Sequence, residues 1–199
     1  MTFRQKMTAY VVLGILGILA VTTWSYVWYI QEQGNFHTIT PGEAYRSAQL
    51  DRDELKHYVH EHGIRSIINL RGKRPGKDWY RQEIATSREL GVRHFDYGGI
   101  GAVRPPTPKE LAELLTLFAS APRPVLLHCQ AGADRSGLAA AIWKEEIDGT
   151  TAAEARKQLS LRYGHMPVGP TQVLDEFFDA WASAEANGAA AKTVADKEN

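Results

Sequence analysis

Cys129 and its neighbours could carry out chemistry, because their types and spacing suit a nucleophile beside an anion site. Cys129 is the only cysteine of the chain and lies in the stretch PVLLHCQAGADRSG, residues 124–137. A single cysteine cannot form an internal disulfide, so it is either a small buried hydrophobic residue or a reactive thiol. Two glycines, an arginine and a serine follow it within eight residues. These neighbours decide between the two alternatives.

The local pattern places these residues between a strand and a helix. Residues 124–128, PVLLH, are an apolar run typical of a buried strand, and residues 136–147, SGLAAAIWKEEI, form a helical pattern. Cys129 then ends the strand, and Arg135 lies beside the helix N-terminus, where free N–H groups and the helix dipole attract anions. Ligands of open α/β sheets bind at this edge. The stretch therefore predicts an anion site.

Single residues of the loop fit that prediction. Gly132 can adopt backbone angles closed to other residues, so that successive amides turn toward one oxyanion. Arg135 offers a planar fork that matches two phosphate oxygens, and Gly137 allows the following helix to pack closely. The same positive surroundings favour the thiolate of Cys129.

The rest of the chain alternates between helical and extended patterns. Helical spacing or capping signals mark residues 51–63, 78–91, 107–120, 150–164 and 171–185, and extended patterns mark residues 64–70 and 92–97. This alternation predicts an α/β fold, a single three-layer sandwich with a short, mostly parallel central sheet flanked by helices. The length suits one such domain.

The N-terminal segment predicts one transmembrane helix before that domain. No charged residue lies between Met7 and Gln31, and residues 9–30 are long enough to cross a bilayer as a helix. A cleaved signal peptide is the alternative, because Arg4 and Lys6 precede an apolar core of suitable length. Aromatic residues at the far end favour the anchor, since they gather at membrane interfaces. They are Trp24, Tyr26, Trp28 and Tyr29.

The predicted organisation has four parts. Residues 1–31 form a membrane anchor or uncleaved signal, 32–42 a linker, 43–182 the catalytic domain and 183–199 a disordered tail with few groups to bury. The basic residues before the span would stay on the cytoplasmic side, which places the domain on the other face. Charges balance at 23 basic and 23 acidic residues, which argues against nucleic acid as a partner.

The loop resembles the signature of a known family. HCQAGADRSG is similar to the motif His-Cys, five residues, Arg, Ser or Thr of the cysteine-dependent protein tyrosine phosphatase superfamily. The similarity is strongest to the dual-specificity-like branch with atypical bacterial, plant and fungal members, and it covers residues 43–180. It implies hydrolysis of a phosphorylated protein or a small phosphorylated substrate, without a metal or other cofactor. It also implies a bacterial inner-membrane protein with a periplasmic domain.

The resemblance implies a role for each matching residue. Cys129 would form a phosphocysteine, Arg135 would bind the phosphoryl oxygens, and Ser136 would donate a hydrogen bond to the thiolate. His128 would steady the loop. The substrate phosphate would be bound by Gln130, Ala131, Gly132, Ala133 and Gly137.

Two aspartates compete for the role of general acid. Family members normally carry this aspartate on a mobile loop before the cysteine. Asp96 has about that spacing but lies in a predicted strand, and the loop after it, residues 98–106, has no carboxylate. Asp134 resembles an atypical subgroup with an aspartate just before the arginine, and we favour it because a donor must reach the leaving oxygen. His165, on a later loop, either lines the site or is an ordinary surface or core histidine.

The basic stretch RGKRPGK, residues 71–77, has two interpretations and does not decide the class of substrate. It would attract the phosphate of a lipid, an inositol or a glycan, or it is only a solvated loop. Its charges are Arg71, Lys73, Arg74 and Lys77.

Two other functions fit parts of the same loop. A rhodanese-like sulfurtransferase has a cysteine loop one residue shorter than the five residues between Cys129 and Arg135. A catalytically dead phosphate-binding module would usually lack Cys129, Arg135 or Ser136, and all three are present. Loss of turnover in Cys129→Ser would distinguish an enzyme from such a module.

Overall fold

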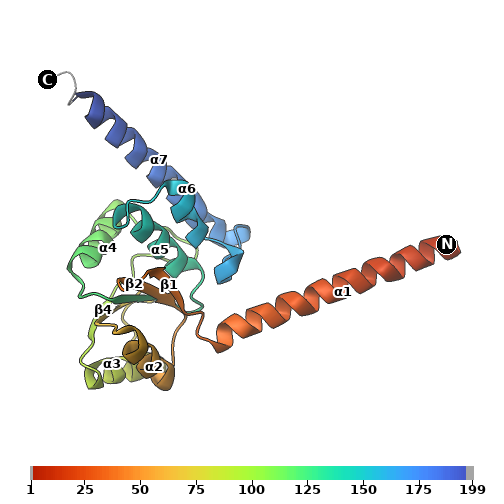
Figure 1. Ribbon diagram of the computed structural model, residues 1–199, viewed down its shortest axis with the longest axis horizontal. Helices are drawn as coiled ribbons and strands as arrows, with labels where there is room; N and C mark the ends of the chain where they lie inside the picture. The colour runs from red at the N-terminus through yellow and green to blue at the C-terminus, as the bar shows by residue number, and fades with distance from the viewer. Residues whose placement is uncertain (1, 196–199) are drawn as a thin grey trace.

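The computed structural model describes residues 2–195, and its body is a five-stranded sheet between two layers of helices (Figure 1). The sheet order is β1-β2-β5-β3-β4, with β1 antiparallel to β2 and all other neighbours parallel. The strands are β1 (His37–Thr40), β2 (Ala44–Ser47), β3 (Ser66–Asn69), β4 (Arg93–Asp96) and β5 (Val125–His128). The predicted α/β sandwich with a short, mostly parallel sheet is confirmed.

Seven α-helices accompany the sheet in the described part of the chain. They are α1 (Phe3–Glu32), α2 (Arg52–His62), α3 (Asp78–Glu89), α4 (Pro108–Ser120), α5 (Asp134–Glu146), α6 (Ala152–Ala155) and α7 (Gln172–Ala195). Three short 3₁₀ helices join α6 to α7: η1 (Arg156–Gln158), η2 (Leu161–Tyr163) and η3 (Gly169–Thr171). Figure 1 shows α2 and α3 on one side of the sheet, and α4 and α5 on the other.

Successive side chains of β5 point to opposite faces of the sheet and therefore belong to two different hydrophobic cores. Val125 and Leu127 belong to the larger core, which α4, α5 and α7 cover, and Leu126 belongs to the smaller core, which α2 covers. The same alternation continues into the loop. Cys129 lies in the larger core beneath α5, whereas His128 faces Glu83 of α3. His128 and Cys129 therefore point to opposite faces of the sheet, as successive residues of a strand do.

Capping residues mark some helix ends as the sequence predicts. Thr107 forms a capping box with Glu110 at the start of α4, and Gly63 ends α2 in a left-handed conformation. The predicted helix over residues 150–164 is shorter, because α6 has four residues and two 3₁₀ turns follow it. Beyond α6, Gln158 contacts Arg46 of β2, and His165 contacts Asp134, which follows the loop 129–133 between β5 and α5, termed the catalytic loop.

Two predictions differ from the structure. The segment 32–42 is not only a linker, because β1 lies in it and pairs with β2. Residues 183–195 continue α7, where a disordered tail was expected over 183–199; alanines dominate this stretch, and alanine is the strongest helix former. Residues 196–199 lie outside the described residues.

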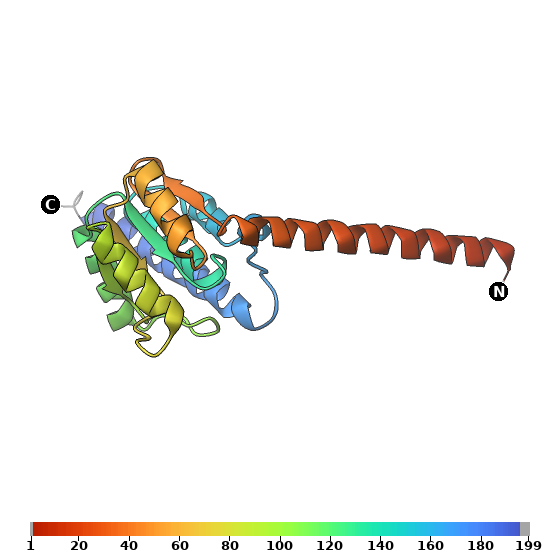
Figure 2. The same cartoon turned by 90° about the horizontal axis from the view of Figure 1, so that it is seen from below.

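The N-terminal helix α1 extends away from the body (Figure 2). Its stretch Phe3–Tyr26 has 24 residues and a mean hydropathy of 1.9, so it is long and apolar enough to cross a membrane. An N-terminal signal sequence meets the same criteria. Length and composition therefore fit the predicted anchor.

Candidate active site

The loop between β5 and α5 brings the predicted residues together at the carboxyl edge of the sheet. Cys129 follows β5 and is only 2% exposed, and Asp134 begins α5. The Sγ atom of Cys129 lies 3.4 Å from Ser136 Oγ, within range of a hydrogen bond. Arg135 lies in the first turn of α5 and lines a cavity of about 180 Å³ together with Gln130. A nucleophile, a hydroxyl and a guanidinium therefore share one site.

Glycine is required at two positions by the shape of the loop. Gly132 has a φ of 70°, in the region that favours glycine. A Cβ atom there would lie 2.6 Å from the backbone nitrogen of Ala48. A Cβ atom on Gly137 would lie 3.1 Å from the carbonyl oxygen of Gln158. The loop and α5 are thus closely packed against β2 and η1.

Arg46 of β2 forms hydrogen bonds with backbone carbonyl groups of the loop. Its fully buried guanidinium donates from NH2 to the carbonyl oxygens of Gly132 and Ala133, each at 2.9 Å. NH1 donates to the carbonyl oxygen of Gln158 at 2.7 Å. Because a planar trans peptide directs its C=O and N–H to opposite sides, the amides that follow these carbonyls point away from Arg46. Arg46 therefore helps to turn loop amides toward the anion site.

The charge of Arg46 also bears on the site. Burial lowers the pKa of Arg46 to about 10, while the charges of Cys129, Tyr163 and Asp134 act to raise it. The guanidinium thus stays protonated near neutral pH, and it sits over the ring of Tyr163 at 4.2 Å. A permanent positive charge therefore lies beneath the loop.

Asn35 connects the segment after α1 to the same loop. Its side-chain nitrogen donates to the carbonyl oxygens of Ala131 and Tyr163, each at 2.9 Å. The residue is 1% exposed and has a φ of 44°, which asparagine tolerates better than most residues. The chain that leaves α1 is therefore fixed directly to the catalytic loop.

Sequence reasoning assigned no role to Arg46 or Asn35. The available signal for Arg46 was its place in the stretch AYRSAQL, just before the predicted helix over residues 51–63. Asn35 gave no local signal, because its partners Ala131 and Tyr163 are 96 and 128 residues away in the sequence.

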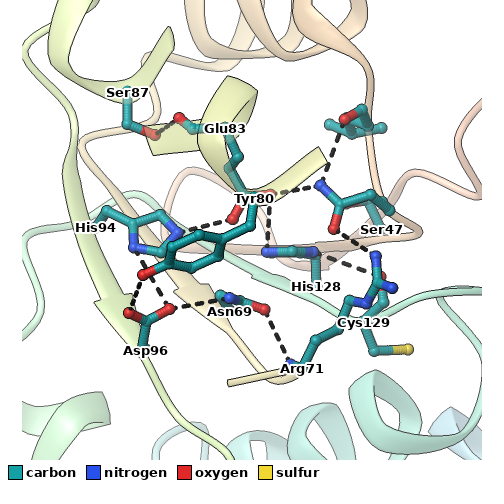
Figure 3. Close-up of polar contacts among 12 residues, drawn as sticks. Ser47, Asn69, Arg71, Tyr80, Glu83, Ser87, His94, Asp96, His128 and Cys129 are labelled. Atoms are coloured by element: carbon teal, nitrogen blue, oxygen red, sulfur yellow. Dashed lines mark hydrogen bonds and ion pairs between the residues drawn. The ribbon is translucent and has the colours of Figure 1, made fainter. Parts of the chain in front are cut away.

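A polar network lies behind the loop, between β5 and α3 (Figure 3). His128 Nε2 lies 3.2 Å from Glu83 Oε2, and Glu83 also contacts His94 Nε2 at 2.7 Å and Gln49 Nε2 at 2.6 Å. Burial acts to raise the pKa of Glu83, but the charge of His128 and the hydrogen bonds from His128, His94 and Gln49 lower it well below its usual range. An ionised Glu83 thus fixes the histidine that precedes Cys129.

Asp96 belongs to this network. Its Oδ2 accepts from the Tyr80 hydroxyl at 2.5 Å, and its Oδ1 accepts from Asn69 Nδ2 at 3.0 Å. Asn69 pairs in register with both Asp96 and His128, so β3 separates Asp96 from β5. Figure 3 shows the Asp96 carboxylate directed toward Tyr80 and Asn69.

His165 is in contact with Asp134. Its side chain is fully buried, with Nδ1 2.8 Å from Asp134 Oδ1 and Nε2 2.9 Å from Asp175 Oδ2. Asp175 also pairs with Arg156 at 2.7 Å. Burial acts to lower the pKa of His165, but its hydrogen bonds to Asp134 and Asp175 and their charges raise it above its ordinary value. Each ring nitrogen of His165 therefore lies within hydrogen-bond distance of one carboxylate.

The predicted basic loop faces the site. Residues of this loop line the 180 Å³ cavity next to Gln130 and Arg135. The guanidinium of Arg71 lies 3.7 Å from the ring centre of Trp79, which holds it at the cavity wall. The other lining residues are Arg74 and Lys77. Within residues 2–195, no group of three or more His, Cys, Asp and Glu side chains is placed to hold a metal ion.

The parallel sheet, the cysteine loop and the arginine at the start of α5 define a cysteine-dependent phosphatase of the protein tyrosine phosphatase superfamily, with a dual-specificity-like architecture. The family model PTP-NADK, described as a DSP-PTPase phosphatase fused to NAD+ kinase, matches residues 20–170. The chain belongs to this family. No curated protein sequence matches it.

Several solved structures share the fold. The core catalytic domain of the PP-IP phosphatase SIW14 from S. cerevisiae is 21% identical, with a TM-score of 0.59 over 80% of this chain and 92% of that chain. TpbA from P. aeruginosa is 21% identical, with a TM-score of 0.55 over 76% of this chain and 91% of that chain. PTPMT1 is 17% identical, with a TM-score of 0.57 over 77% of this chain and 99% of that chain.

Proposed function

We propose that this chain is a membrane-anchored phosphatase that hydrolyses phosphate monoesters through a phosphocysteine intermediate. The observation that carries the proposal is the position of Cys129, 3.4 Å from Ser136 Oγ in a loop whose carbonyl groups bind Arg46. A nucleophile there would face a phosphoryl group bound by Arg135 and loop amides. The length and composition of α1 support the anchor.

The reaction would take two steps. The thiolate of Cys129 attacks phosphorus, an S–P bond forms, and the P–O bond to the leaving group breaks with its electron pair going to the leaving oxygen. Arg135 and the loop amides of residues 130–135 stabilise the charge that spreads over the other oxygens. Water then attacks phosphorus and the S–P bond breaks, while Ser136 donates a hydrogen bond to the departing sulfur. No step requires a metal or an organic cofactor.

Asp134 would be the general acid of the first step. It begins α5 beside Arg135, and its side chain is 28% exposed, so it can reach the space that receives the substrate. After it gives its proton to the leaving oxygen, its carboxylate accepts a hydrogen bond from His165. In the second step the carboxylate takes a proton from the attacking water. Asp96 has both oxygens engaged by Tyr80 and Asn69, which supports a structural role for it.

Phosphotyrosine or another phosphoprotein is the proposed substrate class. A loop that binds only the phosphoryl group accepts any monoester that reaches Cys129. TpbA, which shares the fold, is also solved in complex with pTyr.

A phosphate of a lipid, an inositol or a glycan is the second candidate. The cavity wall formed by Arg71, Arg74 and Lys77 beside Arg135 favours it, because these cations would bind a second anionic group next to the reacting phosphate. The S. cerevisiae protein with this fold is named as a PP-IP phosphatase.

The test uses the full chain in detergent micelles with p-nitrophenyl phosphate. We expect turnover that a chelator leaves intact and vanadate inhibits, and no turnover by Cys129→Ala. Ser136→Ala should accumulate the phosphoenzyme, whereas Ser183→Ala, on the exposed face of α7, should behave as the wild type. Substantial hydrolysis by Cys129→Ala, or sulfur transfer from thiosulfate in place of hydrolysis, would refute the mechanism.

A further inference from the structure

Exposed apolar side chains gather at the edge of the sheet that holds the catalytic loop. Outside α1, the large apolar side chains that are exposed among the described residues lie on two loops, residues 97–107 and 159–171, and each is more than half exposed. They are Val103, Leu161, Met166 and Val168. The first loop follows the carboxyl end of β4, and His165 of the second contacts Asp134, which follows the catalytic loop. Single exposed apolar residues are ordinary, but their restriction to one edge needs a reason.

The same edge carries positive charge. The two loops and the basic loop 70–77 contain no Asp or Glu, although the whole chain has a net charge of zero. Their basic residues are Arg71, Lys73, Arg74, Lys77, Arg104 and Arg162, of which Arg104 is paired with Glu110 of α4. At the starts of α2 and α3 at this edge, Asp51 caps α2 and Asp78 pairs with Arg81, and Asp53 is an exposed carboxylate in the first turn of α2. Apolar side chains beside cations suit the surface of an anionic bilayer.

Two of the four apolar residues, Leu161 and Met166, lie beside the last turns of the apolar stretch of α1. The Tyr26 hydroxyl donates to the carbonyl oxygen of Arg162 at 2.8 Å. A cavity of about 380 Å³ is lined from α1 by Thr22, Thr23 and Tyr26, and from the second loop by Leu161, Gly164 and Met166. Tyr26 ends the span Phe3–Tyr26. If that span lies in a bilayer, Leu161 and Met166 lie at its boundary with water.

The exit of α1 fixes which edge faces the membrane. Asn35, three residues after the end of α1, binds the catalytic loop through the carbonyl oxygen of Ala131. Figure 2 shows α1 leaving the body at the end where the loop before α7 also lies. A domain attached at this point cannot move its catalytic edge far from the bilayer without breaking the contacts of Asn35 and Tyr26.

We propose that the catalytic edge lies on the surface of the bilayer that α1 crosses. Val103, Leu161, Met166 and Val168 enter the boundary between headgroups and acyl chains, and the basic residues bind anionic headgroups. The inference rests on the proposed anchoring and phosphatase activity, and it favours the second of the two candidate substrate classes: a phosphate monoester carried by a lipid of that bilayer reaches Cys129 from the membrane side.

The first experiment measures depth with the full chain in vesicles that contain phosphatidylglycerol. In a Cys129→Ser background, Val168→Cys carries an environment-sensitive fluorophore, and Ala119→Cys, exposed on the last turn of α4 at the opposite edge, is the matched control. We expect a nitroxide attached to lipid to quench the Val168 label, and aqueous iodide to quench it at least about fivefold less than the Ala119 label. Equal access of iodide to both labels would overturn the docking.

The second experiment compares substrates in the same vesicles. Val168→Glu and Val103→Glu should lose about tenfold in turnover of phosphatidic acid, because a carboxylate opposes entry into an anionic bilayer, and stay within about twofold on p-nitrophenyl phosphate. Ala119→Glu should change neither. Equal effects on both substrates, or a selective loss on a soluble phosphotyrosine peptide, would overturn the inference and, in the latter case, assign the edge to a protein partner.

Different results would refute the proposed phosphatase activity and the proposed membrane docking. Absence of wild-type turnover of p-nitrophenyl phosphate would refute the proposed activity, but the depth measurement does not depend on catalysis. Release of the chain from vesicles by carbonate would refute the anchor and the docking together.

Discussion

Each ring nitrogen of His165 contacts a carboxylate. The two carboxylates differ in their exposure and in their other partners. Asp175 is 3% exposed, and its carboxylate pairs with Arg156 and contacts Nε2 of the ring. Asp134 is more exposed, and it contacts the ring at Nδ1. The greater exposure of Asp134 favours it as the proposed general acid, and His165 would position it and stabilise the carboxylate that remains.

The first prediction concerns this acid and depends on the leaving group. Asp134→Asn should slow hydrolysis of an alkyl phosphate at least about a hundredfold, because general acid catalysis is worth that much for a poor leaving group, and p-nitrophenyl phosphate far less. Asp96→Asn should slow both substrates alike or neither, since its carboxylate binds Tyr80 and Asn69. Steady-state rates of both variants on both esters are the measurement. The opposite pattern would transfer the role to Asp96.

The second prediction concerns the pH dependence of stability. The pKa of His165 is raised above 6.5 in the folded chain, so its charge contributes stability that is fully present below pH 6.5 and is lost as pH rises through the raised value. The melting temperature of the wild type should therefore fall as pH rises above about 6.5 more steeply than that of His165→Gln. His60→Gln, at an exposed position of α2, should keep the wild-type slope. Parallel curves for the wild type and His165→Gln would exclude this contribution.

At the scale of the elements, local signals explain what could be predicted from the sequence. The capping residues Thr107 and Gly63 predicted helix ends, because their interactions are made within one turn. The loop 129–137 could be identified because its functional residues lie next to one another in the sequence. β2 was missed because it has four residues, is buried along its whole length and includes Arg46, so it shows neither alternation nor an apolar run. The role of Arg46 depends on partners more than 85 residues away, which no local pattern reports.

The third prediction separates backbone strain from crowding in the loop. Gly132 and Gly149 both have positive φ, 70° and 64°, but only at Gly132 would a Cβ atom meet the backbone, and Gly149 has open space. Gly149→Ala should cost about 1 kcal/mol in the free energy of unfolding from the left-handed conformation alone. Gly132→Ala should cost more and lower kcat/KM at least about tenfold, because the loop amides shift. Thermal unfolding and kinetics of both variants test this, and equal effects would mean that β2 does not constrain the loop.

At the scale of the whole molecule, α1 and the candidate active site are directly connected. Asn35 and Tyr26 contact residues of the catalytic loop and of η2, so α1 is fixed to the body of the molecule. Removal of residues up to 33 would eliminate α1, the proposed anchor, and leave Asn35 at a free end. A shortened chain therefore tests loop order as well as membrane attachment, and substrate measurements belong with the full chain.

The last prediction concerns the side of the membrane on which the domain lies. Arg4 and Lys6 precede the span, and no Lys or Arg follows it until Arg46. Because basic residues near a span stay in the cytoplasm, the domain should lie on the other face. A reporter enzyme that needs disulfides, fused after Asn199 in a bacterial host, should be active only with this orientation.

Reversal of the charge asymmetry is the control for that prediction. Arg4→Glu and Lys6→Glu, combined with Gln31→Lys and Gln33→Lys, should lower reporter activity, because the basic residues then follow the span. The substituted positions lie outside the catalytic loop, so any phosphatase activity of detergent-solubilised protein should remain. Reporter activity that is absent from the wild type and gained by the reversed chain would place the domain in the cytoplasm, and the lipid substrate would then belong to the inner leaflet.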